Sequence, residues 1–98
     1  MSKNHVYQIR LCKRYKKDIK RLAKSNVNLD PLEDIINKLA NRKLLPGRCK
    51  DHALKGKLQN TRECHIKADW LLRYAKYEDE LILILISTGS HRNVLGIE

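Results

Sequence analysis

Hydrophobic residues near the N-terminus change from the alternation of a strand to the spacing of a helix. Tyr7, Ile9 and Leu11 alternate with polar residues, and this period of two predicts a short first strand over residues 7–11. From Cys12 to Lys24 apolar residues recur at spacings of three and four, while lysines and arginines fill most other positions. The pattern predicts an amphipathic helix with a strongly cationic outer face.

A second amphipathic helix is predicted after a clear start signal at Asp30. Asp30 is a typical N-cap residue, Pro31 suits the first helical position because its missing N–H costs nothing there, and Glu33 suits the third. The apolar stripe that follows should end near residues 41–43, before Pro46 and Gly47. We expect the two helices to form an antiparallel hairpin that covers a sheet.

The second half of the chain supplies most of that sheet. Residues 47–60 carry two glycines and many polar groups, which predicts a loop. Residues 61–67 read as a strand. Cys64 and Ile66 point to one face, and Glu63, His65 and Lys67 point to the other. If Cys64 and Ile66 face the helices, His65 lies on the open face of the sheet.

Two further strands complete the predicted fold. Residues 71–77 read as a strand, residues 78–80 as a charged turn, and residues 81–86 as six apolar residues typical of a strand buried on both faces. The expected fold class is α+β, with an N-terminal strand and a two-helix hairpin packed on a small, mostly antiparallel sheet (β-α-α-β-β-β). The 98 residues are predicted to form a single domain over residues 1–98.

The charge of the chain restricts its possible partners. The formal net charge is +10 at pH 7, and a surface this basic repels itself unless a polyanion neutralises it. Nucleic acid is the first candidate partner, and an acidic protein is the second. Because no apolar run approaches the roughly 20 residues of a membrane-spanning helix and no signal-peptide pattern is visible, we expect a cytoplasmic protein without a membrane partner. The three widely spaced cysteines fit reduced thiols.

Candidate proton-transfer groups lie around the predicted strands of the second half. Cleaving RNA without a metal requires a base for the 2′-hydroxyl proton, an acid for the leaving 5′-oxygen and cations for the phosphate. Imidazole suits both proton roles, because an unperturbed pKa of about 6.5 allows either state near neutral pH. A carboxylate would orient a histidine or act as a base. The catalytic candidates, which need no cofactor, are His52, His65, Asp69 and His91.

Cations and one large aromatic residue lie close to these candidates in the sequence. Trp70 follows Asp69 directly and suits either a base-stacking platform or a position in the core. The cationic face of the first helix suits contact with nucleic acid, with an acidic protein or simply with solvent. The basic candidates for holding phosphate are Lys50, Lys55, Lys57, Arg62 and Arg73.

A zinc site is the main chemical alternative to acid–base catalysis. Cys49 and His52 have the spacing of two zinc ligands, and Cys64 with His65 would complete a set of four. Neighbouring residues on a strand point to opposite faces, so Cys64 and His65 are not expected to bind the same ion. We therefore expect no metal. No phosphate-binding glycine loop and no nucleophilic serine or cysteine arrangement is visible in the sequence.

Four blocks of the second half stand out when they are taken together. They are Lys50-Asp51-His52-x-Leu54-x-Gly56, then Arg62-Glu63-Cys64-His65-Ile66-Lys67-x-Asp69-Trp70-Leu71-Leu72-x-Tyr74, then Glu80-Leu81-Ile82-Leu83, and finally Thr88-Gly89-Ser90-His91. In this order they resemble the YafQ branch of the RelE/ParE toxin superfamily. The predicted N-terminal strand and helix hairpin agree with that family's layout.

The resemblance implies the toxin of a type II toxin–antitoxin system, an endoribonuclease (mRNA interferase) that cuts mRNA in the ribosomal A site without a metal. The family's site histidines fall on His52, His65 and His91, its aspartate on Asp69 and its tryptophan on Trp70. The products expected are a 2′,3′-cyclic phosphate, or the 3′-phosphate from its hydrolysis, and a 5′-hydroxyl. The partners expected are mRNA and rRNA on the ribosome and a cognate antitoxin, through which the pair would contact operator DNA.

Two positions depart from the family's pattern. Relatives commonly carry an arginine where this chain has Ser87, and an aromatic residue where it has Leu95. The first change removes a cation from the site, and the second removes a stacking surface for RNA. Arg73 or Arg92 would supply the missing charge, so both join the candidate RNA-binding residues together with Leu95.

Two other classes of function remain open at this point. A ParE-like inhibitor of DNA gyrase would share the fold but not the histidines and the acid. A catalytically weak relative would bind nucleic acid without cutting it. Retention of all four catalytic candidates favours the ribonuclease.

Overall fold

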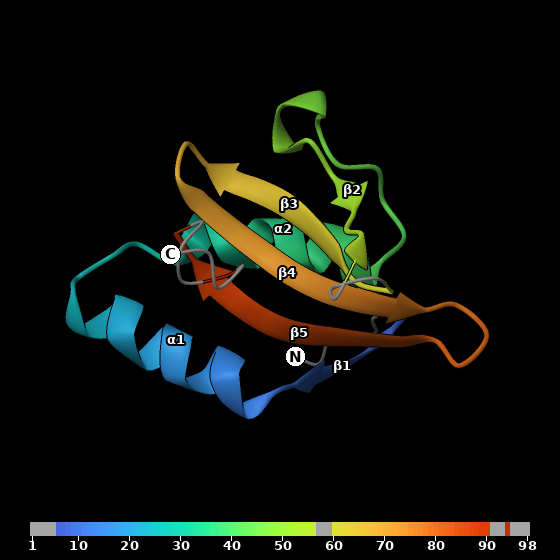
Figure 1. The fold of residues 1–98 in the computed structure, drawn as a ribbon, viewed down its shortest axis with the longest axis horizontal. Helices are drawn as coiled ribbons and strands as arrows, with labels where there is room; N and C mark the ends of the chain where they lie inside the picture. Colours follow the sequence, from blue (N-terminus) through green and yellow to red (C-terminus); the bar gives the residue numbers. More distant parts are fainter. Residues whose placement is uncertain (1–5, 57–59, 91–93, 95–98) are drawn as a thin grey trace.

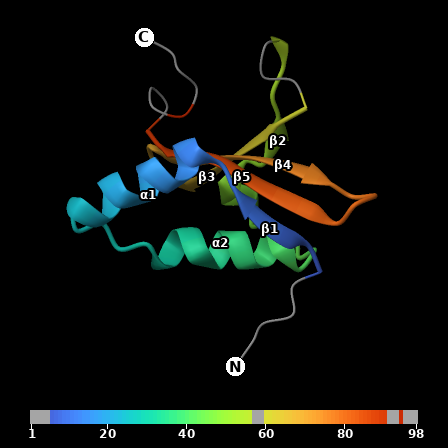
Figure 2. The same ribbon diagram turned by 90° about the horizontal axis from the view of Figure 1, so that it is seen from below.

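The computed structural model describes residues 6–56, 60–90 and 94, which form a five-stranded sheet with two helices (Figure 1). Helix α2 lies across one face of the sheet, and α1 packs beside it against β5 (Figures 1 and 2). The expected α+β class is therefore confirmed. The elements are β1 (Gln8–Leu11), α1 (Lys13–Lys24), α2 (Asp30–Ala40), the 3-10 turn η1 (Gly47–Cys49), β2 (His52–Ala53), β3 (Arg62–Lys67), β4 (Trp70–Tyr77) and β5 (Ile82–Gly89).

The strands are arranged in the order β1-β5-β4-β3-β2. The meander from β2 to β5 is antiparallel, as predicted for the second half. Strand β1 pairs with β5 in parallel, with Ile9 opposite Leu83. Residues from the two ends of the described chain therefore lie side by side, and the sheet is mixed with one parallel pair.

The prediction of a continuous loop over residues 47–60 was wrong. Residues Gly47–Cys49 form η1, and His52 and Ala53 form β2, an edge strand paired with Glu63 and Arg62 of β3. A two-residue strand is too short to show alternation, so its pairing partner alone creates it. His52 consequently belongs to the sheet and not to a loop.

Burial on β5 also differs from the prediction of a strand buried on both faces. Leu83 and Leu85 are buried against the helices, as members of the core that includes residues of α2. The side chains on the opposite face are only half-buried, because the helices pack on the other side; they are Ile82, Ile84 and Ile86. Leu81, predicted to start this strand, instead adopts a φ of 55° in the preceding turn.

Helix α2 begins one residue earlier than predicted. Asp30 is the first helical residue and not the N-cap, and its backbone N–H donates to Oδ1 of Asn28 at 3.0 Å. Pro31 lies in the first turn, where its missing N–H costs nothing. The start signal was read correctly, but the side chain that satisfies the helix terminus comes from Asn28.

Alternation along β3 follows the prediction. Cys64 and Ile66 are buried in the core, and His65 is half-buried on the other face. Burial raises the pKa of the Cys64 thiol to about 12, so this cysteine stays protonated near neutral pH. None of the helices in the described part of the chain has the length and apolarity to span a membrane.

Candidate functional site

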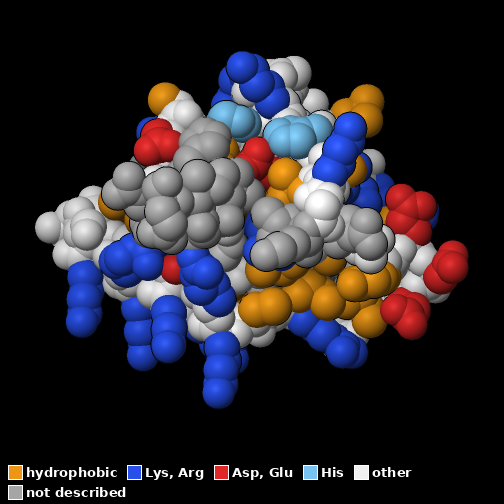
Figure 3. All heavy atoms as spheres, in the orientation of Figure 1, with side chains coloured by type: hydrophobic (Ala, Val, Ile, Leu, Met, Phe, Trp, Pro, Cys, Tyr) orange, Lys and Arg blue, Asp and Glu red, His pale blue; other side chains and the backbone are white. Residues whose placement is uncertain are grey.

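Strands β2 and β3 bring two of the predicted catalytic residues onto one surface. His52 on β2 lies opposite Glu63 on β3, and His65 is two residues further along β3. Figure 3 shows the histidine side chains gathered on one face of the molecule, with acidic and basic groups around them. The short strand β2 is thus the element that gives His52 and His65 a common surface.

Both ring nitrogens of His52 have close neighbours. Nδ1 lies 2.6 Å from the backbone oxygen of Lys50, and Nε2 lies 3.1 Å from Oε1 of Glu63. Lys50 adopts a left-handed conformation with φ 48° after η1, and this turns its carbonyl toward the ring. The imidazole is held in place from two sides, although 49% of the His52 side chain remains exposed.

Glu63 was not recognised from the sequence as a site residue. It lies on the same face as His65, as the alternation predicted, but only 3% of it is exposed. Its second oxygen, Oε2, is buried without a hydrogen-bond partner among the described residues. The alternation of β3 indicated its face, but its position beneath His52 follows only from the pairing with β2.

A second polar network attaches the segment before β2 to the sheet. Oδ1 of Asp51 accepts a hydrogen bond from the Tyr74 hydroxyl at 2.6 Å and one from Nε of Arg62 at 3.3 Å. Burial raises the pKa of Tyr74, and the hydrogen bond to Asp51 raises the pKa of Arg62. Arg62, a predicted phosphate ligand, is therefore engaged with Asp51 while 38% of its side chain stays exposed.

His65 and Asp69 border different concave surfaces. His65 lines a shallow pocket of about 280 Å³ whose rim carries cations, with Arg48, Lys50 and Lys67. Asp69 lines a smaller pocket of about 190 Å³ with Trp70 and Ser90. The structure brings His52, His65 and Lys50 together. Asp69 lies at the other pocket, next to Trp70.

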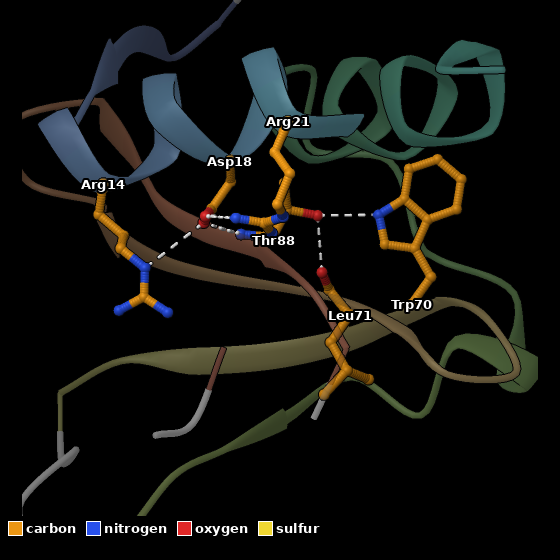
Figure 4. A network of polar contacts seen from close by, with 6 residues as sticks. All are labelled: Arg14, Asp18, Arg21, Trp70, Leu71 and Thr88. Carbon is orange, nitrogen blue, oxygen red and sulfur yellow. Dashed lines mark hydrogen bonds and ion pairs between the residues drawn. The ribbon is translucent and has the colours of Figure 1, made fainter. Parts of the chain in front are cut away.

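Trp70 is tied to the end of β5 by a hydrogen bond (Figure 4). Its indole N–H donates to Oγ1 of Thr88 at 3.0 Å, and the Thr88 hydroxyl donates to the backbone oxygen of Leu71 at 2.7 Å. The half-buried ring packs against the core. Of the two roles suggested by the sequence, these contacts fit a position in the core.

Asp18 of α1 completes this network and was missed in the sequence (Figure 4). Only 2% of Asp18 is exposed; Oδ2 accepts the backbone N–H of Thr88 at 3.0 Å, and Oδ1 pairs with Arg21 at 3.0 Å. Nε of Arg14 lies 3.7 Å from Oδ2. A signal was present, because Asp18 is spaced three residues from Tyr15 and four from Leu22, which places it on the apolar stripe.

Arg73 lies on the open face between β3 and β5. It is opposite Glu63 on one side and Ser87 on the other, and its Nε donates to Oγ1 of Thr61 at 3.4 Å. Burial and the nearby charge of Arg14 lower the pKa of Arg73. Lys50 and Lys55 are exposed. The remaining predicted site residues, Lys57, His91, Arg92 and Leu95, lie outside the described residues.

The geometry does not favour the zinc alternative. Cys49 and Cys64 are both fully buried in the core, while His65 lies on the opposite face of β3 from Cys64. Within residues 6–56, 60–90 and 94, no group of three or more histidine, cysteine or acidic side chains is arranged to hold a metal ion. The separation of Cys64 from His65 follows the strand alternation that the sequence predicted.

Comparison with known proteins connects this arrangement to a family. A family model described as the bacterial toxin of type II toxin–antitoxin system, YafQ, matches residues 7–96. The chain belongs to the YafQ toxin family. The expected resemblance to YafQ is thereby confirmed, and it covers the N-terminal half as well as the C-terminal blocks.

Individual YafQ relatives agree with this assignment. The mRNA interferase toxin YafQ of Escherichia coli strain K12 is 36% identical over 83 residues, which cover 84% of this chain and 88% of that protein. A metal-bound toxin from Helicobacter pylori is 39% identical with a TM-score of 0.83, covering 90% of this chain and 98% of the other. YafQ in the E. coli DinJ-YafQ toxin-antitoxin complex is 30% identical with a TM-score of 0.82, covering 92% and 98%.

Proposed function

We propose that this YafQ-family toxin is a ribosome-dependent endoribonuclease, an mRNA interferase that cleaves mRNA in the ribosomal A site. The observation that carries the proposal is the pair of histidines, His52 and His65, on one basic surface of a chain with a net charge of +10. Such a surface attracts a phosphodiester backbone, and imidazoles can give and take protons near neutral pH. The name of the E. coli relative, mRNA interferase toxin, supports the same substrate class.

The chemistry is a transfer of the phosphoryl group within the RNA itself. A base removes the proton of the 2′-hydroxyl, the 2′-oxygen attacks phosphorus, and an acid protonates the departing 5′-oxygen. The products are a 2′,3′-cyclic phosphate, which water can open to a 3′-phosphate, and a 5′-hydroxyl. His52, His65, Asp69 and His91 share the proton transfers, and His91 is the first choice for a direct acid or base.

Binding of the RNA is assigned to the cations around these groups, together with Trp70 and Leu95. Arg73 and the basic rim of the His65 pocket hold phosphate, which stabilises the extra negative charge of the transition state. The mechanism uses no metal ion and no cofactor. The proposed RNA-binding residues are Lys50, Lys55, Lys57, Arg62, Trp70, Arg73, Arg92 and Leu95.

Dependence on the ribosome has a physical basis. The pockets beside His65 and Asp69 are small, about 280 and 190 Å³, and both are shallow. Precise orientation of the reacting groups is worth several kcal/mol of the barrier, on the order of 7 or more. The decoding site would supply this orientation by holding the codon while the toxin supplies proton donors and cations.

The proposed partners follow from charge and from the family. A cognate antitoxin with an acidic binding segment would neutralise the basic surface, as the DinJ-YafQ complex of the relative suggests. Operator DNA would be contacted only through the antitoxin. The site of action would be the cytoplasm, where the ribosomes are.

The test is mapping of mRNA 5′ ends on translating ribosomes after adding the purified protein. In-frame cuts within the A-site codon that disappear with the His91→Gln variant would support the proposal. Toxin treated with EDTA and then desalted should cut equally well on ribosomes in their usual magnesium buffer; lost activity restored by zinc or copper would contradict the metal-free mechanism. Uncut message with correctly folded protein would favour nucleic-acid binding alone, and gyrase inhibition would be assayed next.

A further inference from the structure

Helix α1 takes over the edge of β5 where β1 ends. The pairing of β1 with β5 runs as far as Leu85, whose backbone oxygen also accepts the N–H of Cys12 at 3.0 Å. Further along α1, Oδ2 of Asp18 accepts the N–H of Thr88 at 3.0 Å. The first half of α1 therefore runs beside residues 86–88 of β5.

Arg14 lies between these two points of attachment. It follows Cys12 by two residues and precedes Asp18 by about one helical turn, so it stands beside the stretch of β5 that contains Ser87. Its Nε is 3.7 Å from Oδ2 of Asp18, and 50% of its side chain is exposed. In Figure 4 its terminal nitrogens point away from α1. Asp18 thus holds the guanidinium through Nε and leaves its outer end directed away from the helix.

A bulge in β5 places Ser87 on the same face of the sheet as Arg73. Arg73 is opposite Ser87, whereas the next residue of β4, Tyr74, is opposite Leu85, so Ile86 is the extra residue. Tyr74 and Leu85 belong to the core beneath the helices. Because directly opposed residues share a face, the bulge returns Ser87 to the open face with Arg73.

Arg14 and Arg73 approach this position from the two edges of β5. Arg73 comes from β4 on one side, and Arg14 comes from α1 on the other. Burial lowers the pKa of Arg73, and so does the nearby charge of Arg14. A like charge acts in this way when the two groups lie close together. Two guanidiniums from segments far apart in the sequence therefore converge beside Ser87.

The arginines here outnumber the acidic groups beside them. Asp18 pairs with Arg21 at 3.0 Å, a shorter distance than its 3.7 Å separation from Arg14. Glu63 lies opposite Arg73 on β3, and within the described residues no ion pair joins the two. Three guanidiniums, which stay charged at any working pH, therefore stand beside two carboxylates. The surplus of positive charge favours a bound anion.

We propose that Arg14 and Arg73 bind one phosphate of the RNA between them. The inference rests on the proposed function and deepens it, because it adds α1 to a binding surface otherwise built from the sheet and its loops. A guanidinium matches a phosphate with two parallel hydrogen bonds. Each arginine would donate from its terminal nitrogens, while Nε of Arg14 stays beside Asp18 and Nε of Arg73 stays on Thr61. The bound phosphate would also relieve the repulsion between the two cations.

The direct test follows the arginine Nε–H signals by NMR while a short 2′-O-methyl RNA is added at low salt. This RNA lacks the attacking 2′-hydroxyl, so it stays uncut. We expect the signals of Arg14 and Arg73 to move along one binding curve, and Arg73→Gln to weaken the affinity reported at Arg14 by about 10-fold. An unmoved Arg14 signal, or the same curve in Arg73→Gln, would overturn the proposal. So would a glutamate peptide that binds the pair more tightly than the RNA, because the site would then fit an acidic protein.

Cleavage on ribosomes tests the same pair in the reaction. It should fall by about 10-fold in Arg14→Gln at equal folded fraction. Arg21→Gln is the matched control, because it removes another arginine paired with Asp18, roughly 10 Å further along the helix. We expect this control to cleave as wild type does. Equal losses in the two variants would assign the effect to the ion pairs of Asp18 or to total charge, and would overturn the phosphate site.

The NMR titration needs no ribosome, so the two proposals can fail separately. Binding at both arginines in a protein that cuts no message would support the phosphate site and overturn the ribonuclease. A-site cutting that is unchanged in Arg14→Gln would support the ribonuclease and overturn the phosphate site.

Discussion

Arg73 lies directly opposite Ser87 in the antiparallel pairing of β4 and β5. Ser87 occupies the position where relatives that the sequence resembles commonly carry an arginine. Its side chain is fully buried, and its hydroxyl has no hydrogen-bond partner among the described residues. An arginine therefore stands opposite the position that lacks one, on the adjacent strand, and its Nε donates to Thr61. We interpret Arg73 as the replacement for the missing cation.

Replacing Arg73 with glutamine should reduce cleavage on ribosomes by about 10²-fold, the typical loss for one group that stabilises transition-state charge. Measured single-turnover rates at saturating toxin would show the loss. Arg10→Gln is a matched control, since Arg10 is an exposed arginine on β1 at the far edge of the sheet. Normal toxicity of an Arg73→Ala, Arg92→Ala double variant would remove the idea of compensation.

Asp18→Ala should lower the free energy of unfolding by about 2–3 kcal/mol, because the buried N–H of Thr88 loses its acceptor. Asp18→Asn should cost less, since an amide oxygen can still accept this bond. Urea unfolding measures both. Asp34→Ala, which breaks an exposed ion pair with Lys38 on α2, should change stability by less than about 0.5 kcal/mol. Equal effects at residues 18 and 34 would contradict the anchoring role of Asp18.

Trp70→Phe separates the core role of this residue from base stacking. The variant keeps an aromatic ring but loses the hydrogen bond to Thr88, so we expect a stability loss of about 1 kcal/mol in urea unfolding. Cleavage should stay within a few-fold of wild type once folded fractions are matched. Wild-type stability would contradict the role of the hydrogen bond to Thr88, and a large drop in cleavage would show that a phenyl ring cannot replace the indole against RNA.

Stability should decline at alkaline pH. Burial raises the pKa of Cys64 from 9.0 to about 12 and that of Tyr15 from 10.0 to about 12. Between these values the unfolded chain has lost protons that the native protein retains, so stability falls as pH rises from about 9 to 12. The slope is at most about 1.4 kcal/mol per pH unit for each group.

Urea midpoints measured from pH 8 to 11 would show this decline. Tyr15→Phe should flatten it above pH 10, because one of the titrating groups is removed. A profile that is equally steep in the wild type and in Tyr15→Phe would refute the contribution of Tyr15.

Local patterns were sufficient for the elements and for the family. Periods of two and of three to four depend only on residues close in sequence, so they predicted the helices, the strands other than β2, and the burial of Cys64 and Ile66. The blocks around His52 and His65 were sufficient for the YafQ family, which the match over residues 7–96 confirms. A period, however, indicates which face a side chain occupies and not which residue it meets there.

The relationships that organise the site depend on pairing across long stretches of chain. Strand β2 exists because it pairs with β3, and that pairing places Glu63 beneath His52. Asp18 meets the backbone of Thr88 across 70 residues of sequence. The sequence alone determined the helices, the longer strands, the basic charge and the family of this protein. Only the tertiary structure decided which buried carboxylate holds which group, because such contacts arise when distant segments pack together.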